Sequence, residues 1–234
     1  LQYFITVGEK KELFTYPGRQ EGSPSDWDFN NRNPFEVRVV SKSSPVYIFD
    51  ARADNDELSR AWNRASSFIP GTEPGKAEIR VVIDKLFTID AENPKAANIN
   101  DYSMRYYFGK KVTHNREILA GKKDIIFRGR SLANKPCWVQ LALITKMGEA
   151  FGGMIKVDSI SGDYKLSVKD LKKVRLVTLP RPYPTFLPYF FEDKREGSVD
   201  LREVETLQIS IGPGIPESEL NDRHALAIES VRLE

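Results

Sequence analysis

Alternation of apolar and polar residues with a period of two runs through most of this sequence. The alternating segments are short, and they are bounded by Gly, Pro, Asn and Asp, which favour turns. Successive side chains of a strand point to opposite faces, so the pattern predicts half-buried strands. The segments that qualify are 35–40, 46–49, 77–82, 102–108, 125–128, 138–145, 153–157, 164–168, 174–178, 206–211 and 226–233.

Helical periodicity is scarce. Residues 56–62 could form one or two turns after an Asp cap at Asp54 or Asp56, and 168–171 could hold another short turn. Many short strands without long helices between them favour an all-β fold, an antiparallel β-sandwich or jelly roll with short helical turns.

Two parts of such a sandwich differ in composition. We expect residues 1–75 to be an N-terminal irregular segment with strands that belong to the same sandwich, and 76–234 to be its jelly-roll core. Within the first part, 12–34 is rich in Gly, Pro, Ser, Asp and Asn and is predicted to be irregular, and 63–76 is predicted to be a long loop.

The final segment, HALAIESVRLE, changes phase along its length. Leu226 and Ile228 share one face of a strand, and so do Val231 and Leu233. Ile228 and Val231 are three residues apart, so a regular strand would place the two pairs on opposite faces. One extra residue in a strand restores the phase, so we expect a β-bulge near Glu229-Ser230.

Charge and hydropathy exclude several classes of partner. The 35 Lys and Arg residues nearly balance the 33 Asp and Glu residues, and the signs are interspersed, which gives no electrostatic basis for binding nucleic acid. No stretch approaches the roughly 18 consecutive apolar residues of a membrane span. The sequence begins at Leu1 rather than Met, and we expect a processed or excised protein that is secreted, periplasmic or at the cell surface.

The sequence contains few residues that could act as a catalytic nucleophile or as a transition-metal ligand. Cys137 is the single cysteine and lies in an apolar run, which favours a small buried side chain and excludes an internal disulfide. Nucleophile elbows, phosphate-binding glycine loops and paired-histidine zinc motifs do not occur. No recognisable catalytic set is present.

Aromatic and planar polar side chains on strand faces favour a sugar ligand. Sugar rings present apolar C–H faces to aromatic rings, and their hydroxyls pair with planar donors and acceptors. Trp138 and Gln140 share a face of one strand, Arg105 and Tyr107 share a face of another, and Arg128 lies on a third. The alternative is that the aromatic rings belong to the core and the arginines are ordinary outward residues.

Residues 180–191 read PRPYPTFLPYFF, with four prolines and five aromatic rings. Proline cannot donate to the interior of a sheet, so this segment is predicted to be a long edge connection. Tyr183 and Tyr189 carry polar tips, and we expect these two to face a ligand. The alternative is that the rings cap the sandwich or contact a neighbouring domain.

Three carboxylates close together in the sequence suggest a structural calcium. Asp50, Asp54 and Asp56 are oxygen ligands of the kind that Ca²⁺ prefers. Their spacing lacks the EF-hand pattern, and a helix cap with a solvated turn is the alternative.

Longer stretches carry a resemblance to a known family. The runs CWVQLALITKMGEAFGGMIKV, DYKLSVKDLKKVRLVTLPRPYP, VETLQISIGPG and LAIESVRLE resemble the galactose-binding-like β-sandwich modules of bacterial polysaccharide-degrading enzymes, over roughly residues 76–234. The resemblance implies a jelly roll, often with a structural calcium, that binds a glycan without catalysis on a concave sheet face or in loops at one end.

Three functions remain open from the sequence. The leading hypothesis is a noncatalytic carbohydrate-binding or accessory module of a secreted polysaccharide-processing protein, with a glycan and a neighbouring catalytic domain as partners. The second is a glycoside hydrolase or polysaccharide lyase on the same fold, using acids such as Asp101 or Glu205. The third is a structural spacer that packs on a catalytic neighbour.

Overall fold

The structure is a computed structural model of the chain. It describes all residues except 10–11, 37–40, 42, 61–65, 89–97, 100–101, 114–115, 178–189 and 192–196. The chain divides into two compact units, Leu1–Ser44 and Pro45–Glu234. The segment 1–75, expected as one part of a single sandwich, is thus shared between these two units.

The described residues of the smaller unit form five short strands, β1 (Gln2–Tyr3), β2 (Ile5–Glu9), β3 (Glu12–Tyr16), β4 (Gln20–Glu21) and β5 (Phe35–Glu36). Strand β1 pairs with β5, and β2, β3 and β4 form an antiparallel three-stranded sheet. The prediction that 12–34 is irregular is wrong for β3 and β4. Pairing with β2 satisfies the backbone of β3, and the hydroxyl of the fully buried Thr15 donates to the carbonyl of Gly22 at 2.5 Å.

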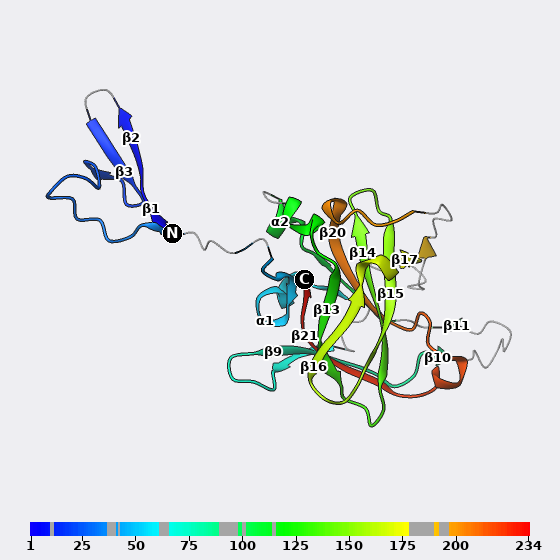
Figure 1. The fold of residues 1–234 in the computed structure, drawn as a ribbon. Helices are drawn as coiled ribbons and strands as arrows, with labels where there is room; N and C mark the ends of the chain where they lie inside the picture. The colour runs from blue at the N-terminus through cyan, green and yellow to red at the C-terminus, as the bar shows by residue number, and fades with distance from the viewer. Residues whose placement is uncertain are drawn as a thin grey trace, which may run out of the picture. The chain divides into compact units, whose positions relative to one another are not determined.

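The larger unit is an antiparallel β-sandwich of two six-stranded sheets (Figure 1). We name each sheet after a central strand. The β21 sheet contains β16 (Gly162–Ser167), β13 (Asp124–Ser131), β21 (His224–Leu233), β9 (Ala77–Ile83) and β8 (Ser66–Pro70), with β6 (Val46–Asp50) also paired to β21. The β14 sheet contains, in order, β17 (Lys172–Lys173), β15 (Ala150–Val157), β14 (Cys137–Thr145), β20 (Val204–Ile211), β12 (Tyr102–Tyr107) and β7 (Ser59–Arg60).

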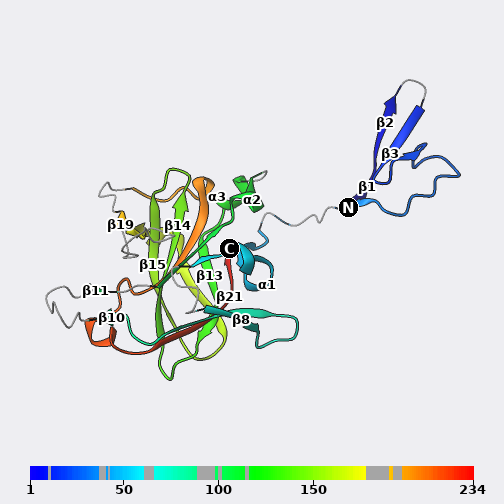
Figure 2. The ribbon, with the colours of Figure 1, turned by 180° about the vertical axis from the view of Figure 1, so that it is seen from behind.

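Short elements complete this unit, and Figure 2 shows several of them from behind. Two further strand pairs are β10 (Phe87–Thr88) with β11 (Asn98–Ile99), and β18 (Leu176–Val177) with β19 (Phe190–Phe191). The helices are α1 (Ala51–Asp54), α2 (Gly109–Val112) and α3 (Glu117–Ala120), and the 3-10 turns are η1 (Asn55–Glu57), η3 (Val168–Asp170), η4 (Leu201–Glu203) and η5 (Glu217–Glu219). None of the described helices is long and apolar enough to span a membrane.

The core lies between the two sheets, and every second residue of the central strands points into it. Val139, Leu141 and Leu143 of β14 are fully buried, as are Leu226 and Ile228 of β21. Burying each of these side chains stabilises the fold by about 2 kcal/mol before entropy is counted. The period of two therefore produced the predicted sandwich, and the side chains between these positions point away from the core.

The last strand has the predicted bulge. Along β21, Ser230 pairs with Arg128 and Ile228 pairs with Gly129, so that Glu229 is the extra residue. The bulge also marks a change of partner on the other edge, because β21 pairs with β9 up to Ile228 and with β6 from Ser230 onwards. One strand thereby joins three others.

The segment 45–75 contains more β-strand residues than the sequence predicted. Strand β8 lies within 63–76, where a long loop was predicted, and it pairs with β9 from Ser66↔Val81 to Pro70↔Ala77. The prediction missed it because Ser66 and Ser67 begin the strand, so that apolar and polar residues do not alternate, and because Pro70 ends it. Proline is tolerated there because β8 is an edge strand.

Helix α1 begins earlier than predicted. The side chain of Asp50 accepts hydrogen bonds from the backbone N–H groups of Arg52 and Ala53, so Asp50 is the cap rather than Asp54 or Asp56. The helix predicted at 56–62 is wrong for residues 58–60, because η1 ends at Glu57 and β7 follows it; residues 61 and 62 lie outside the described residues. The short turn predicted at 168–171 is confirmed as η3.

Asp54 joins α1 to the β14 sheet. Its carboxylate accepts hydrogen bonds from the Tyr106 hydroxyl at 2.8 Å and from the Asp50 backbone N–H at 2.7 Å, and it pairs with Lys111 at 2.6 Å. Burial, together with the hydrogen bond to Asp54, raises the pKa of Tyr106. This cluster fixes β12, which carries two of the candidate ligand residues.

Candidate functional site

The outward face of the β14 sheet carries a row of polar side chains on its three central strands. Across these strands Gln140 pairs with Ser210 and Ser210 with Ser103, and one step further along Ala142 pairs with Gln208 and Gln208 with Arg105. Paired residues point to the same face, so these side chains lie together. We call Gln140, Ser210, Ser103, Gln208 and Arg105 the polar row.

Hydrogen bonds connect the polar row. Arg105 donates from Nη2 to Oε1 of Gln208 at 2.8 Å, and Gln208 donates from Nε2 to the hydroxyl of Ser210 at 3.2 Å. The hydroxyls of Ser210 and Ser103 lie 2.9 Å apart. Gln208, Ser210 and Ser103 are all at most 1% exposed. Polar groups are costly to bury unless they are paired, and this network offsets that cost.

One member of the polar row has an unsatisfied acceptor. Gln140 is 9% exposed, and its Oε1 atom is buried with no hydrogen-bond partner among the described residues. A buried amide oxygen without a donor costs on the order of 1–3 kcal/mol. The end of the row near Gln140 thus contains an acceptor that is buried and unsatisfied by the described residues.

Arg105 is the cation of the polar row. Burial lowers the pKa of its guanidinium, which nevertheless stays protonated at neutral pH because a free guanidinium titrates far above that range. The bond to Gln208 orients the planar group. A partly dehydrated guanidinium in a fixed position is a strong and directional donor.

Aromatic rings flank the polar row at opposite corners. Tyr107 on β12 is 44% exposed, and Trp138 on β14 is half-buried, with Nζ of Lys156 lying 5.4 Å from its ring centre. By the register, Trp138 and Tyr107 lie six residues apart along the strand direction, which is about 20 Å. Both rings point to the same side of the sheet as the polar row.

Arg128 lies elsewhere. It belongs to β13 of the other sheet and points outward, where it pairs with Glu73 at 2.7 Å, with Asp163 at 3.3 Å and with Glu229 at 3.3 Å. These carboxylates raise the pKa of Arg128, against the effect of burial. The structure therefore does not bring Arg128 together with Arg105, and it places Arg128 in an ion-pair network.

The three aspartates predicted to hold calcium are used differently. Asp50 caps α1, Asp54 accepts from Tyr106 and Lys111, and Asp56 accepts from the Asn55 amide at 3.1 Å. Within the described ranges, no three His, Cys, Asp or Glu residues gather as they would around a metal ion. A calcium ion at this place would need ligands beyond these three carboxylates, since it takes six to eight oxygens.

The remaining candidates divide into two groups. Tyr183 and Tyr189 of the proline-rich segment, and the acid Asp101, lie outside the described residues. Glu205 lies on β20, where an oxygen of its carboxylate is 3.8 Å from Nη2 of Arg116. The neighbouring Glu203 pairs with Lys146 at 3.4 Å. Each of these two glutamates is thus paired with a cation.

Sequence reasoning missed Gln208, Ser210 and Ser103. A signal was present, because Thr206, Gln208 and Ser210 are polar at every second position of a strongly apolar strand. The pattern places them on one face of β20 but does not reveal which strands lie beside it. Their role depends on the pairing of β20 with β12 and β14.

Comparison with known proteins gives likenesses in fold. No protein-family model matches the chain, and no curated protein matches it. A family 11 carbohydrate-binding module from Clostridium thermocellum, solved with a β-1,3-1,4-mixed-linked tetrasaccharide, is 11% identical with a TM-score of 0.43, over 72% of this chain and 81% of that one. An agarase is 13% identical with a TM-score of 0.46, over 81% of this chain and 24% of that one.

An exo-β-agarase is similar to the same degree, with 11% identity and a TM-score of 0.46 over 81% of this chain and 24% of that one. This chain thus spans about a quarter of the length of either agarase. All three of these structures have TM-scores below 0.5 with this chain. At these identities and TM-scores they carry no argument about a ligand, so any assignment depends on the geometry of the β14 sheet itself.

Proposed function

We propose that this chain is a noncatalytic carbohydrate-binding module, an accessory part of a secreted polysaccharide-processing protein, and that a glycan binds over the outward face of the β14 sheet. The observation that carries the proposal is the polar row. A hydrogen-bonded network of amides, hydroxyls and one guanidinium lies on a sheet face that points away from the core.

The chemistry of the row suits sugar hydroxyls. A hydroxyl both donates and accepts, so it needs planar partners of both kinds at fixed positions. Arg105 supplies donors, and the amide oxygen of Gln140 has no donor among the residues that the structure describes. Gln208 is 1% exposed and acts as a positioning residue, since it holds the guanidinium of Arg105.

The flanking rings supply the apolar part of such a site. The accessible ring of Tyr107 can lie against the C–H face of a sugar, and Trp138 offers a second ring about 20 Å away along the strands. A ligand that contacts both must contain several sugar units. This geometry supports a polysaccharide chain rather than a monosaccharide.

Isothermal titration against a panel of neutral oligosaccharides from plant and algal cell walls tests the proposal. We expect binding by at least one member and a loss of about tenfold in affinity for Tyr107→Ala, because a stacked ring contributes about 1–1.5 kcal/mol. The matched control is Tyr47→Ala, since Tyr47 is 47% exposed and lies on the β21 sheet.

Two results would contradict the proposal. One is the absence of heat with every glycan while the protein gives a cooperative unfolding transition. The other is an equal loss of affinity in the Tyr47 and Tyr107 variants, which would show that the outward face of the β14 sheet is not the surface involved.

A further inference from the structure

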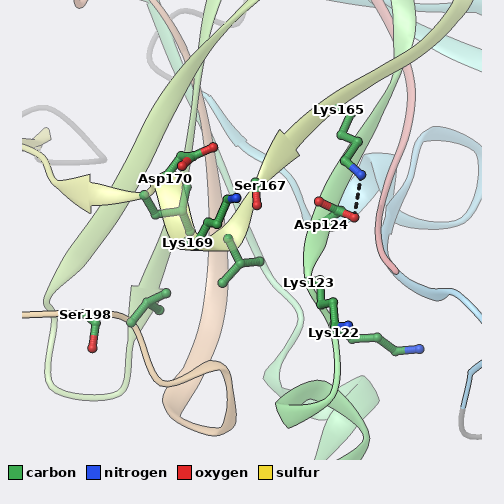
Figure 3. Close-up of a pocket in the computed structure, with 11 residues that line it drawn as sticks. Lys122, Lys123, Asp124, Lys165, Ser167, Lys169, Asp170 and Ser198 are labelled. Atoms are coloured by element: carbon green, nitrogen blue, oxygen red, sulfur yellow. Dashed lines mark ion pairs between the residues drawn. The ribbon is translucent and has the colours of Figure 1, made fainter.

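A pocket of about 610 Å³ lies at the end of the β21 sheet, where β13 begins and β16 ends (Figure 3). Its wall continues through η3 and residues 198–199. None of the residues that line it belongs to the polar row. A volume in the range of about 300–1,000 Å³ is typical of sites for small molecules.

Backbone hydrogen bonds hold the walls of this pocket together. Val168 at the start of η3 donates its N–H to the carbonyl of Lys123 at 2.8 Å, and Leu171 closes η3 by donating to the carbonyl of Val168 at 3.3 Å. Leu171 is 7% exposed and belongs to the core. The lining side chains therefore extend from a backbone that the sandwich fixes.

The charge of the lining is positive. The lining contains four lysines, Lys122, Lys123, Lys165 and Lys169, and two aspartates, Asp124 and Asp170. Lys165 is neutralised by Asp124 at 2.8 Å, the ion pair drawn in Figure 3. Among the residues that the structure describes, Lys123 and Lys169 have no carboxylate within ion-pair distance. The lining therefore carries an excess of positive charge, which attracts an anion into the pocket.

Hydroxyl and apolar groups accompany these charges. Ser167 and Ser198 contribute hydroxyls, and Val168, Leu171 and Val199 contribute apolar surface. An inorganic anion needs only the charges and the hydroxyls. A sugar ring that carries an anionic group also uses the apolar wall and fills more of the volume.

We infer that this pocket is a second binding site, which takes a sulfate or carboxylate group carried on a sugar ring. The sugar part rests on the proposed function, whereas the anion part rests on the lysines alone. The chain would then hold an acidic polysaccharide at two places, through the polar row on the β14 sheet and through the lysines at the end of the β21 sheet.

Titration of the ¹⁵N-labelled full chain at low ionic strength tests this site. The probes are glucose 6-sulfate, glucuronate, glucose and sodium sulfate. We expect the two charged sugars to shift the amide signals of Lys123, Ser167 and Lys169, and glucose to leave them unchanged. The dissociation constant of a charged sugar should rise about three- to tenfold in Lys123→Gln/Lys169→Gln. It should also rise with added salt, because ions screen exposed charges.

The control variant is Lys85→Gln/Lys110→Gln, which removes the same charge from exposed positions that do not line the pocket. It should bind as tightly as the unchanged protein. Equal weakening in both double variants would mean attraction by net charge alone and would overturn the site.

Two other outcomes would also overturn it. If sodium sulfate binds as tightly as glucose 6-sulfate, the pocket takes an adventitious ion only. If the charged sugars shift signals of Ser103 and Gln208 instead, the anion binds on the β14 sheet. The second result would leave the proposed function standing. Failure of the proposed function would appear separately, as the absence of any neutral glycan binding at the polar row.

Discussion

The outward faces of the two sheets belong to one sandwich but use arginine in opposite ways. On the β21 sheet, Arg128, Arg130 and Arg232 are each paired with carboxylates at 2.7–3.3 Å. On the β14 sheet, Arg105 is bonded to the neutral amide of Gln208. An arginine among carboxylates is neutralised within the protein, whereas an amide such as that of Gln208 orients a guanidinium without cancelling its charge.

This difference separates stabilising from binding roles. In both sheets the residue is an outward-pointing arginine on a central or near-central strand. The two sheets differ in which side chain the arginine contacts on a neighbouring strand or loop, and the order of the strands in the sheet determines that contact. The ion pairs of the β21 sheet favour a structural role, whereas the polar row is the surface proposed to bind a glycan. Three measurements probe the contrast.

The largest expected effect is on stability, at the β21 sheet. Glu78 is fully buried and accepts two hydrogen bonds from Arg130, at 2.9 and 3.3 Å. Glu78→Ala leaves the guanidinium without these acceptors, and we expect a loss of about 2–3 kcal/mol in the free energy of unfolding, at the low end for a buried pair because Arg130 is partly exposed. Urea unfolding followed by tryptophan fluorescence measures it. Glu78→Gln keeps one acceptor, so its free energy of unfolding should fall by less. A Glu78→Ala variant as stable as the unchanged protein would contradict the structural role of this pair.

A smaller effect is expected at the polar row. Gln208→Ala removes the acceptor of Arg105 and the donor to Ser210, and should lower the free energy of unfolding by about 1–2 kcal/mol. The same variant should weaken binding of a neutral glycan by more than its stability change explains, because Arg105 is no longer oriented. Titration at a temperature where both proteins are fully folded separates the two effects. Unchanged affinity would show that Gln208 has only a structural role.

The smallest effect concerns pH. Hydrogen bonds from Arg232, and then from Arg128, lower the pKa of Asp163 below its usual value of 3.8. A carboxyl with a lowered pKa stabilises the folded state above about pH 4, and this stabilisation is lost as the pH falls through the folded-state pKa. Because Asp163 is partly exposed, we expect less than about 1 kcal/mol.

Urea unfolding at pH 5 and pH 3 should therefore show a smaller decrease for Asp163→Asn than for the unchanged protein. The polar row contains no carboxyl group, so Gln208→Ala should show the same decrease as the unchanged protein. If the free energy of unfolding of Asp163→Asn falls as much between pH 5 and pH 3 as that of the unchanged protein, the acid sensitivity arises outside the Asp163 ion pairs.

Local pattern predicted most of the fold. The period of two located β9, β12, β14 and β21, and the phase change near Glu229 located the bulge, because a strand side chain can reach only one face. The errors arose where tertiary pairing overrides composition. Strand β8 has weak alternation and exists because β9 offers an open edge. Helix α1 begins at a cap, Asp50, that ends a strand, so its start lies before the segment with helical character.

The candidate site was predictable in part. Arg105 and Tyr107 were expected to share a face opposite Tyr106, and Trp138 and Gln140 to share another, and the structure shows both on the outward side of one sheet. Periodicity within a strand is a local property, so it could supply these pairs. It could not show that Gln208 lies between them, or that Arg128 faces three carboxylates, because those neighbours come from distant parts of the chain.

The three-way pairing of β21 bears on how the chain folds as it is synthesised. Strand β9 finds its central partner only when β21 emerges, more than 100 residues later. Until then the β21 sheet lacks its middle strand, and β13, β9 and β6 each have an open edge that can pair with another nascent chain. The ribosome must therefore release almost the whole unit before the sandwich can close, and crowding on polysomes should favour aggregation through these edges.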